Sequence, residues 1–212
     1  MKLHYIDLYG KGESIRMLLA HAKVEYEDVR FPKSDIARMN EAGELEFGQV
    51  PVLDLPEGER LVQSMSILRY LGKLNGYYPE DSKQAYMVDS TLDSLEDVFA
   101  KFYASLGAAT EEAQAKIWDQ NYSCVFPEWA RAMEKRLKEN ESSSYIVGDK
   151  MTAADFHMAS LAYAYIFNDQ NPHAPRLMEI VEAEAPTLKG YFERLGSEEL
   201  AEYLKSRSPR TL

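Results

Sequence analysis

Two short stretches of this chain combine residue types that could hold a small anionic ligand. Gln63 and Ser64 precede the run SMSILRYLGKL, whose apolar residues recur at helical spacing. An amide and a hydroxyl beside the free N–H groups of a helix N-terminus form a natural seat for a carboxylate, and the helix dipole adds to the attraction. Ser64 is also a preferred N-cap residue, and a purely structural N-cap would need no ligand.

The second stretch, FGQVPVL, places Pro51 at the mouth of a predicted strand. A residue before proline is held in extended conformations, and proline itself cannot donate to a β-ladder. If the Val50–Pro51 peptide bond is cis, the turn exposes the backbone N–H and C=O of Val50 to a ligand that pairs like an added strand. Together the two stretches predict a site for a small anionic peptide.

The charge of the chain narrows the classes of partner. Its 24 Lys and Arg residues against 35 Asp and Glu residues leave a formal net charge of −11. A surface of that sign repels phosphate backbones and anionic membranes, so we expect no nucleic-acid partner and no membrane partner. The chain shows neither an apolar run of about 18 residues nor a signal-peptide pattern, which makes the cytoplasm the expected location.

The cysteine and histidine content argues against disulfide, zinc and thiol redox chemistry. Cys124 is the single cysteine, and the 4 histidines are scattered along the chain. One cysteine cannot form an intrachain disulfide, a CxxC pair or a cysteine-rich zinc site. We therefore expect no metal requirement, and we interpret Cys124 as a small, buried or half-buried apolar residue. A glutaredoxin-like oxidoreductase would need a cysteine at the first helix, where YIDLYGKGES has none.

The elements that would position the two stretches divide the chain near residue 78. The segment GYYPEDSKQ there has the composition of a linker. Before it, the patterns predict a strand in 2–10, a helix over 13–24, strands over 26–31 and 50–55, a short strand within 57–63 and a helix over 64–76. The sheet would be mixed, which gives an α/β domain over residues 1–77.

The rest of the chain, residues 83–212, carries helical patterns and is expected to form an all-helical domain. The predicted helices cover 85–106, 113–140, 152–167, 176–184 and 187–195, with a loop over 141–150. Pro127 would kink the second of these helices or separate two. Thr152 and Asp155 have the spacing of a capping box, which is a structural role.

The order and spacing of these segments resemble a cytosolic glutathione transferase, and among its classes most the sigma class, with mu, pi and alpha as relatives. The resemblance rests on LHYIDLYGKGESIRMLL, FGQVPVL, QSMSILRYL and YIVGDKMTAADF, and it covers essentially the whole chain. It implies a thioredoxin-like N-terminal domain, an all-helical C-terminal domain carrying the electrophile site, and a homodimer that binds glutathione, γ-Glu-Cys-Gly.

The resemblance also implies roles for individual residues. Tyr5 would be the catalytic residue, whose hydroxyl bonds the cysteine sulfur of glutathione and favours the thiolate. A strand tyrosine packed on the core is the alternative for Tyr5, and Tyr9 is a competing hydroxyl. The residues implied in glutathione binding are Lys11, Gln49, Val50, Pro51, Gln63, Ser64 and Asp97. Of these, Asp97 would reach across the dimer to the other subunit's glutathione.

Further residues would shape the electrophile site and the dimer. The family builds the electrophile site from its first loop, its long fourth helix and its C-terminal segment, which here supply Leu8, Phe99, Phe102 and Tyr103, with Tyr163 as a further candidate. Aromatic residues at helical spacing are more often core residues than substrate contacts. Phe47 lies where the family has an aromatic key that inserts into the partner subunit, and burying it would strengthen a dimer.

Three positions depart from the sigma pattern. Ile36 stands where sigma members place a tryptophan that contacts the glycyl carboxylate, and Asn40 stands at a lysine position, which puts the affinity for glutathione in question. Ala104 stands where prostaglandin-isomerising members have a tryptophan, which implies a differently shaped electrophile pocket.

An acidic cluster in the long predicted helix has two interpretations. Asp93, Glu96 and Asp97 resemble carboxylates that bind Mg²⁺ or Ca²⁺ at the dimer interface of some sigma members, and carboxylate oxygens suit such cations. A solvated acidic helix face is the alternative in a chain of this charge.

The expected function is conjugation of glutathione to hydrophobic electrophiles, with prostaglandin isomerase or peroxidase chemistry as a side activity. The alternative is a non-catalytic binding or structural protein of the same fold, like a ligandin or a lens crystallin. Tyr5, Gln63 and Ser64 favour the enzyme, whereas Ile36 and Asn40 favour the alternative.

Overall fold

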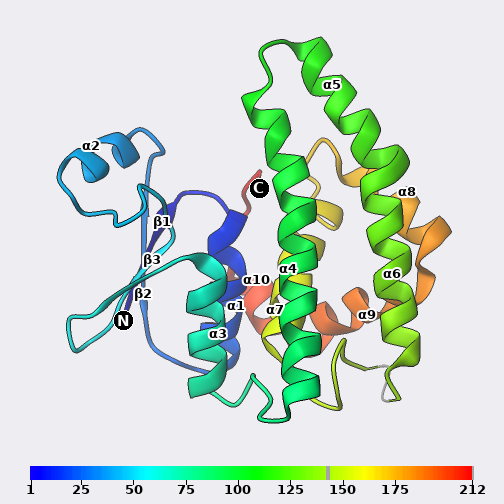
Figure 1. Ribbon diagram of the computed structural model, residues 1–212, viewed down its shortest axis with the longest axis horizontal. Coiled ribbons are helices and arrows are strands. Elements are labelled where there is room, and N and C mark those ends of the chain that lie inside the picture. Colours follow the sequence, from blue (N-terminus) through cyan, green and yellow to red (C-terminus); the bar gives the residue numbers. More distant parts are fainter. Residues whose placement is uncertain (142–143, 212) are drawn as a thin grey trace.

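The computed structural model describes residues 1–141 and 144–211, which form a small sheet domain beside a larger helical domain (Figure 1). The strands are β1 (Lys2–Ile6), β2 (Glu27–Phe31), β3 (Val52–Asp54) and β4 (Arg60–Val62). In the described residues they form one sheet of order β2-β1-β3-β4. Strand β1 runs parallel to β2 and antiparallel to β3, so the predicted mixed sheet is confirmed.

Helices cover both faces of the sheet. Helices α1 (Glu13–His21) and α3 (Ser64–Leu74) lie on the side that faces the helical domain, and α2 (Asp35–Glu41) lies on the other side (Figure 1). Alternation along β3 explains both contacts, because neighbouring strand residues point to opposite faces. Leu53 belongs to the main core, while Val52 packs with Met39 of α2 in a smaller cluster. The sequence patterns did not predict α2.

The helical domain begins with the longest helix, α4 (Ser82–Ala104). It continues with α5 (Glu111–Gln120), α6 (Phe126–Glu139), α7 (Ala153–Leu161), α8 (Ala174–Glu184), α9 (Pro186–Ser197) and α10 (Ala201–Ser206). Short π-helical turns, Asn121–Val125 and Ala162–Ile166, follow α5 and α7. Pro127 is the second residue of α6 and directly follows the π-helical turn Asn121–Val125, which joins α5 to α6. The predicted loop 141–150 includes residues 142 and 143, which lie outside the described residues.

The two domains share one hydrophobic core, which fixes the site between them. Buried residues of α1 and α3 belong to the same cluster as those of α4 and α7, and α1 packs directly on α7. The start of α7 is tied to the linker, because Ala153 N–H donates to the Tyr77 carbonyl at 2.8 Å. Asp155 reaches back to Thr152 N–H at 2.7 Å, as the capping pattern predicts, and also accepts the Tyr191 hydroxyl at 2.7 Å.

After α10 the chain turns back toward α1 as a short C-terminal tail, residues 207–211 (Figure 1). The predicted strand 2–10 ends earlier, at Ile6, and residues 7–12 form a loop closed by a 3₁₀ turn, Gly10–Gly12. The tail contacts this β1–α1 loop, since the Tyr9 hydroxyl donates to the Ser208 carbonyl at 3.1 Å. No helix among the described residues is long and apolar enough to cross a membrane.

Candidate functional site

A cavity of about 430 Å³ lies between the sheet domain and α4. It brings together seven of the residues that the sequence predicts for a glutathione site, Tyr5, Lys11, Gln49, Val50, Pro51, Gln63 and Ser64, and it is also lined by Phe47, which the sequence predicts for the dimer interface. It is also lined by Ile6, Ile36, Gly48, Val62, Met65, Ser66 and Glu96. Asp97 is exposed on α4 and does not line the cavity of its own chain.

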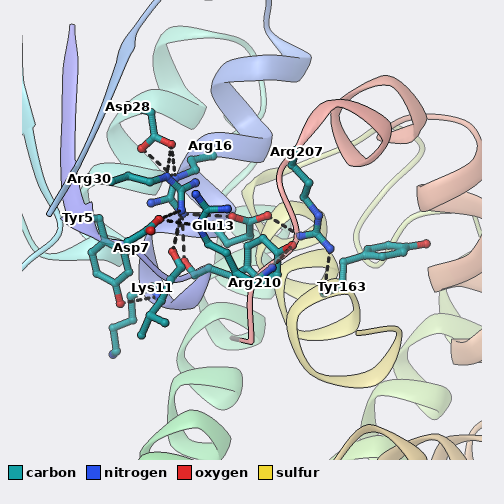
Figure 2. A network of polar contacts seen from close by, with 12 residues as sticks. Tyr5, Asp7, Lys11, Glu13, Arg16, Asp28, Arg30, Tyr163, Arg207 and Arg210 are labelled. Carbon is teal, nitrogen blue, oxygen red and sulfur yellow. Dashed lines mark hydrogen bonds and ion pairs between the residues drawn. The ribbon is translucent and has the colours of Figure 1, made fainter. Parts of the chain in front are cut away.

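Tyr5 presents its hydroxyl to the cavity from the end of β1. The Lys11 backbone N–H donates to this hydroxyl at 3.0 Å, and within the described residues the Tyr5 O–H proton has no acceptor (Figure 2). Burial raises the pKa of Tyr5, although the Lys11 N–H and the Arg16 guanidinium act to lower it. The phenol therefore stays protonated near neutral pH and can donate a hydrogen bond to a bound atom.

Two glycines let the β1–α1 loop approach this hydroxyl. A Cβ atom at Gly10 would lie 2.5 Å from the Tyr5 hydroxyl oxygen, and one at Gly12 would lie 3.0 Å from the Tyr5 ring. Gly10 also has a φ of 40°, in the region that favours glycine. The GKG sequence thus allows the Lys11 N–H to reach Tyr5.

Arg16, which the sequence reasoning missed, lies below the Tyr5 ring. Its guanidinium carbon is 5.6 Å from the ring centroid, and its side chain is 1% exposed. Burial alone would lower the pKa of Arg16, but the Glu13 and Asp28 carboxylates more than reverse that effect and raise it. The charge is therefore permanent. A signal existed in ESIRMLL, where an arginine stands between apolar helix residues three positions after Glu13.

Tyr9, the competing hydroxyl, points away from the cavity. Its hydroxyl donates to the Ser208 carbonyl at 3.1 Å and accepts the Arg210 N–H at 3.2 Å. The side chain is buried, and the Arg207 guanidinium lies 4.1 Å from its ring centroid. Tyr9 thus anchors the C-terminal tail, which leaves Tyr5 as the hydroxyl at the cavity.

The start of α3 forms the opposite wall. Gln63 occupies the N-cap position without a side-chain cap bond, and Ser64 is the first helical residue, so the N-cap interpretation of Ser64 is wrong. Gln63 has φ 69° and ψ 110°, a conformation that L-residues with a side chain rarely adopt. Such strain typically costs about 1–3 kcal/mol and concentrates at ligand sites. Here it leaves the helix N-terminus open to the cavity.

The Val50–Pro51 peptide bond is cis. In the part of the chain that the structure describes, neither the N–H nor the C=O of Val50 makes a backbone hydrogen bond. Gln49 beside it is exposed and borders the same cavity. The segment therefore offers a free donor and acceptor at the cavity edge.

Glu96 forms the helical side of the cavity. One of its carboxylate oxygens pairs with the Lys11 ammonium, and the other lies 3.4 Å from Nε2 of the buried His157 ring. Burial acts to raise the pKa of Glu96, but the His157 contact and the Lys11 charge lower it below its usual range. Because burial lowers the pKa of His157, its ring is neutral near neutral pH, and Lys11 is the cation that balances Glu96.

The acidic cluster of α4 is partly committed to other partners. Asp93 accepts from Arg69 at 2.7 Å, and Glu96 pairs with Lys11. Within the described residues no group of three or more His, Cys, Asp or Glu side chains is placed to hold a metal ion.

The residues predicted for the electrophile site are not gathered around this cavity. Phe99 is 4% exposed and Phe102 is 2% exposed, and Phe102 packs on Trp118 and Phe126 in the core. Tyr103 stacks on Phe99, and its ring centroid lies 5.8 Å from the Lys11 ammonium. Through Lys11, which lines the cavity, Tyr103 is adjacent to the site. Leu8 is half-buried in the β1–α1 loop.

Three further residues have simpler outcomes. Tyr163 donates to the Phe192 carbonyl at 2.7 Å, within the helical domain. Cys124 is exposed in the π-helical turn before α6, so its interpretation as a buried or half-buried residue is wrong. Phe47, by contrast, is 58% exposed and available to a partner.

Comparison with known proteins agrees with this geometry. Residues 1–73 match the family model of the glutathione S-transferase N-terminal domain, and residues 96–207 match that of the C-terminal domain. Human glutathione S-transferase A2 is 35% identical over 167 residues, which span 76% of this chain and 72% of that protein. Cattle glutathione S-transferase A2 is 32% identical over 201 residues, which span 92% and 83%.

A solved structure shares the whole fold. It is that of the monomeric glutathione S-transferase Na-GST-3 from the hookworm Necator americanus, which is 27% identical with a TM-score of 0.84. The match covers 100% of this chain and 98% of the hookworm chain. The chain described here belongs to the glutathione S-transferase family.

Proposed function

We propose that this protein conjugates glutathione to hydrophobic electrophiles, with Tyr5 as the residue that stabilises the glutathione thiolate. The carrying observation is the Tyr5 hydroxyl, which faces the cavity with its oxygen fixed by the Lys11 N–H at 3.0 Å. Its proton is uncommitted and can be donated to sulfur. A hydrogen bond to the thiolate favours the ionised form and so increases the reactive fraction near neutral pH.

The walls of the cavity suit the three parts of glutathione. The γ-glutamyl carboxylate would bind at Gln63, Ser64 and the N-terminus of α3, where the helix dipole is favourable. The cysteinyl backbone would pair with the free N–H and C=O of Val50 in the manner of an added strand. The glycyl carboxylate would lie near Gln49 and Lys11, on the side where Ile36 lines the cavity.

The chemical step is a nucleophilic substitution or addition. The sulfur electron pair forms the new C–S bond while a leaving group departs with its own pair, or while the pair of an activated double bond moves to an electron-withdrawing group. Tyr5 donates its hydrogen bond to sulfur before the step and needs no net proton transfer during it. The electrophile would approach from the side of α4, past Tyr103 and Leu8.

We also propose a homodimer. Asp97 is exposed and does not line the cavity of its own chain, which is the arrangement expected of a residue that contacts the partner's glutathione. Phe47 is exposed and borders the cavity. Membership of the sigma class and a prostaglandin isomerase or peroxidase side activity stay predictions of the sequence pattern. Conversion of prostaglandin H₂ by the purified protein is the assay for the isomerase activity.

The test combines turnover with binding. Wild type and Tyr5→Phe are assayed with glutathione and 1-chloro-2,4-dinitrobenzene, and glutathione binding is measured by calorimetry. We expect kcat to fall by about 100-fold in Tyr5→Phe, because the variant lacks one hydrogen-bond donor to the thiolate anion. Glutathione binding should persist. Equal turnover in the two proteins would contradict the role of Tyr5. Binding without turnover in wild type would support the non-catalytic alternative, and absence of binding would mean that Ile36 and Asn40 disable the site.

A further inference from the structure

The C-terminal tail is joined to the start of α1, next to the β1–α1 loop, by a buried charge network (Figure 2). Glu13 at the start of α1 is fully buried, and its two carboxylate oxygens have different cationic partners. One oxygen accepts from the Arg16 guanidinium at 3.2 Å, and the other accepts from the Arg207 guanidinium at 2.6 Å. The Tyr203 hydroxyl donates to the second oxygen at 3.0 Å. Glu13 thus lies between Arg207 and Arg16, the arginine next to the Tyr5 ring.

The tail is held firmly enough to keep Arg207 in place. The second terminal nitrogen of Arg207 donates to the Tyr163 carbonyl at 2.7 Å, and its guanidinium covers the Tyr9 ring. Beyond it, Arg210 donates to Asp7 at 2.6 Å. The side chain of Arg207 is only 13% exposed, so water screens its charge weakly.

We propose that Arg207 is a positioning residue that acts through Glu13 and Arg16 to keep the glutathione thiol at Tyr5 ionised. This inference rests on the proposed function of the site. Arg207, in the C-terminal tail, would thereby influence the reactivity of a sulfur bound at Tyr5 in the N-terminal domain.

The direction of the effect follows from the signs of the three charges. The Arg16 cation below Tyr5 stabilises negative charge at the hydroxyl and at a sulfur bonded to it, whereas the Glu13 carboxylate opposes that effect. Arg207 neutralises Glu13, so its removal leaves a carboxylate that weakens the field of Arg16. Charges a few ångströms apart in a poorly hydrated interior interact well above thermal energy.

The other groups around Tyr5 and Glu13 keep one charge state across the assay range. Glu96 of α4 is already ionised, since its pKa is lowered, and it pairs with the Lys11 ammonium. Tyr103 of α4 and Tyr165 of the π-helical turn stay neutral because burial raises the pKa of each.

The same holds on the far side of Glu13. Tyr203 of α10 and Tyr26 before β2 stay neutral because burial raises the pKa of each. Asp28 of β2 is paired with Arg16 and Arg30. A change in the thiol titration is therefore assignable to Arg207 and Glu13.

The experiment measures the pH dependence of kcat/KM and the ultraviolet absorbance of the thiolate of bound glutathione. The variants are Arg207→Gln, the charge-conserving Arg207→Lys, and Arg176→Gln as a control that removes an exposed arginine of the same domain. In Arg207→Gln we expect the apparent pKa of the bound thiol to rise by roughly half a unit, about a threefold loss of thiolate below that pKa. Arg207→Lys and Arg176→Gln should retain the wild-type titration.

A double variant separates charge from packing. Replacing Glu13 and Arg207 together, as Glu13→Gln with Arg207→Gln, removes the opposing carboxylate and its neutralising partner at once. The thiol pKa should then return to the wild-type value or fall below it. Thermal unfolding of each variant checks that it is folded.

Several results would overturn the inference. These are an unshifted titration in Arg207→Gln, a loss of kcat that is equal at every pH, or a double variant shifted upward like the single one. Each of them leaves the proposed function standing, provided that wild type ionises bound glutathione and depends on Tyr5. If wild type shows no bound thiolate at all, the proposed function fails and this inference fails with it.

Discussion

The sheet domain and the helical domain contribute to the site in different ways. The wall from the sheet domain consists of backbone groups and polar side chains that are already free: the Val50 N–H and C=O, the N-terminus of α3 and the Tyr5 O–H. From the helical domain, Glu96 lines the cavity, whereas the aromatic residues predicted for the electrophile site, Phe99 and Phe102, are buried and pack against Tyr165 in the core. The sheet domain therefore offers free polar groups to a ligand, whereas the aromatic residues of the helical domain are mostly covered by their neighbours.

This difference follows from the kinds of interaction involved. A polar recognition site needs donors and acceptors fixed in direction, so short loops and a strained Gln63 can form it locally. An apolar site needs uncovered surface, which a protein interior minimises by close packing. We therefore expect the sheet domain to set the affinity for glutathione, and α4 residues close to the cavity, such as Tyr103 beside Lys11, to set the range of electrophiles.

The largest expected effect tests whether the aromatic residues of α4 are core residues. Phe102→Ala should lower the free energy of unfolding by about 3–5 kcal/mol, because it removes a buried ring that contacts Trp118, Phe126 and Tyr165. Urea unfolding measures this loss. Tyr103→Phe, which keeps the ring, is the control and should change stability much less. Unchanged stability in Phe102→Ala with an altered KM for the electrophile would instead place Phe102 in the substrate pocket.

An intermediate effect concerns the apolar residue at the rim of the polar wall. Phe47→Ser should weaken the proposed dimer by about 1.5–3 kcal/mol, the value of burying one aromatic side chain. Its ring is 58% exposed in the single chain, so the stability of the protomer should not change. Light scattering at low micromolar concentration follows the oligomer, with Leu74→Ser, an exposed residue at the end of α3, as the control. A dimer that persists unchanged would remove Phe47 from the interface.

A smaller effect is expected at the start of α3. Ser64→Ala should raise the KM for glutathione by about tenfold, because a hydrogen bond to a carboxylate contributes about 1.5–3 kcal/mol and the helix N–H groups remain. Ser82→Ala, an exposed serine that is the first residue of α4 and does not line the cavity, is the matched control. Equal effects in the two variants would show that the γ-glutamyl end is not held at Ser64.

The smallest effect tests the ion pair that joins the two walls. The pKa of Glu96 is lowered in the folded protein, so the pair stabilises the fold above the unfolded value of about 4.3 and loses this contribution as the pH falls. Glu96→Gln should therefore flatten the decline of thermal stability below pH 4.3. Glu57→Gln, in an exposed turn, should leave the decline unchanged. A full decline in Glu96→Gln would assign acid sensitivity to other carboxylates.

The sequence by itself determined the elements with strong local signals. Alternating and helical patterns located the strands and most helices, and the Thr152 and Asp155 spacing located the start of α7. It did not locate α2 and α10, which are seven and six residues long and carry weak periodicity. Local signals are reliable where propensity, capping and periodicity agree, and short elements depend on what they pack against.

Only the tertiary structure decided between the two tyrosines and between core and pocket. Tyr5 and Tyr9 are both suitable hydroxyls in sequence, but Tyr9 is bonded to Ser208 of the C-terminal tail, 199 residues further along the chain, and Tyr5 faces the cavity. The same holds for Arg16, whose partner Glu13 also binds Arg207 from far along the chain, and for Phe102, whose neighbours come from other helices. The physical reason is that a side chain's type sets what it can do, whereas burial and long-range partners set which of those possibilities remains.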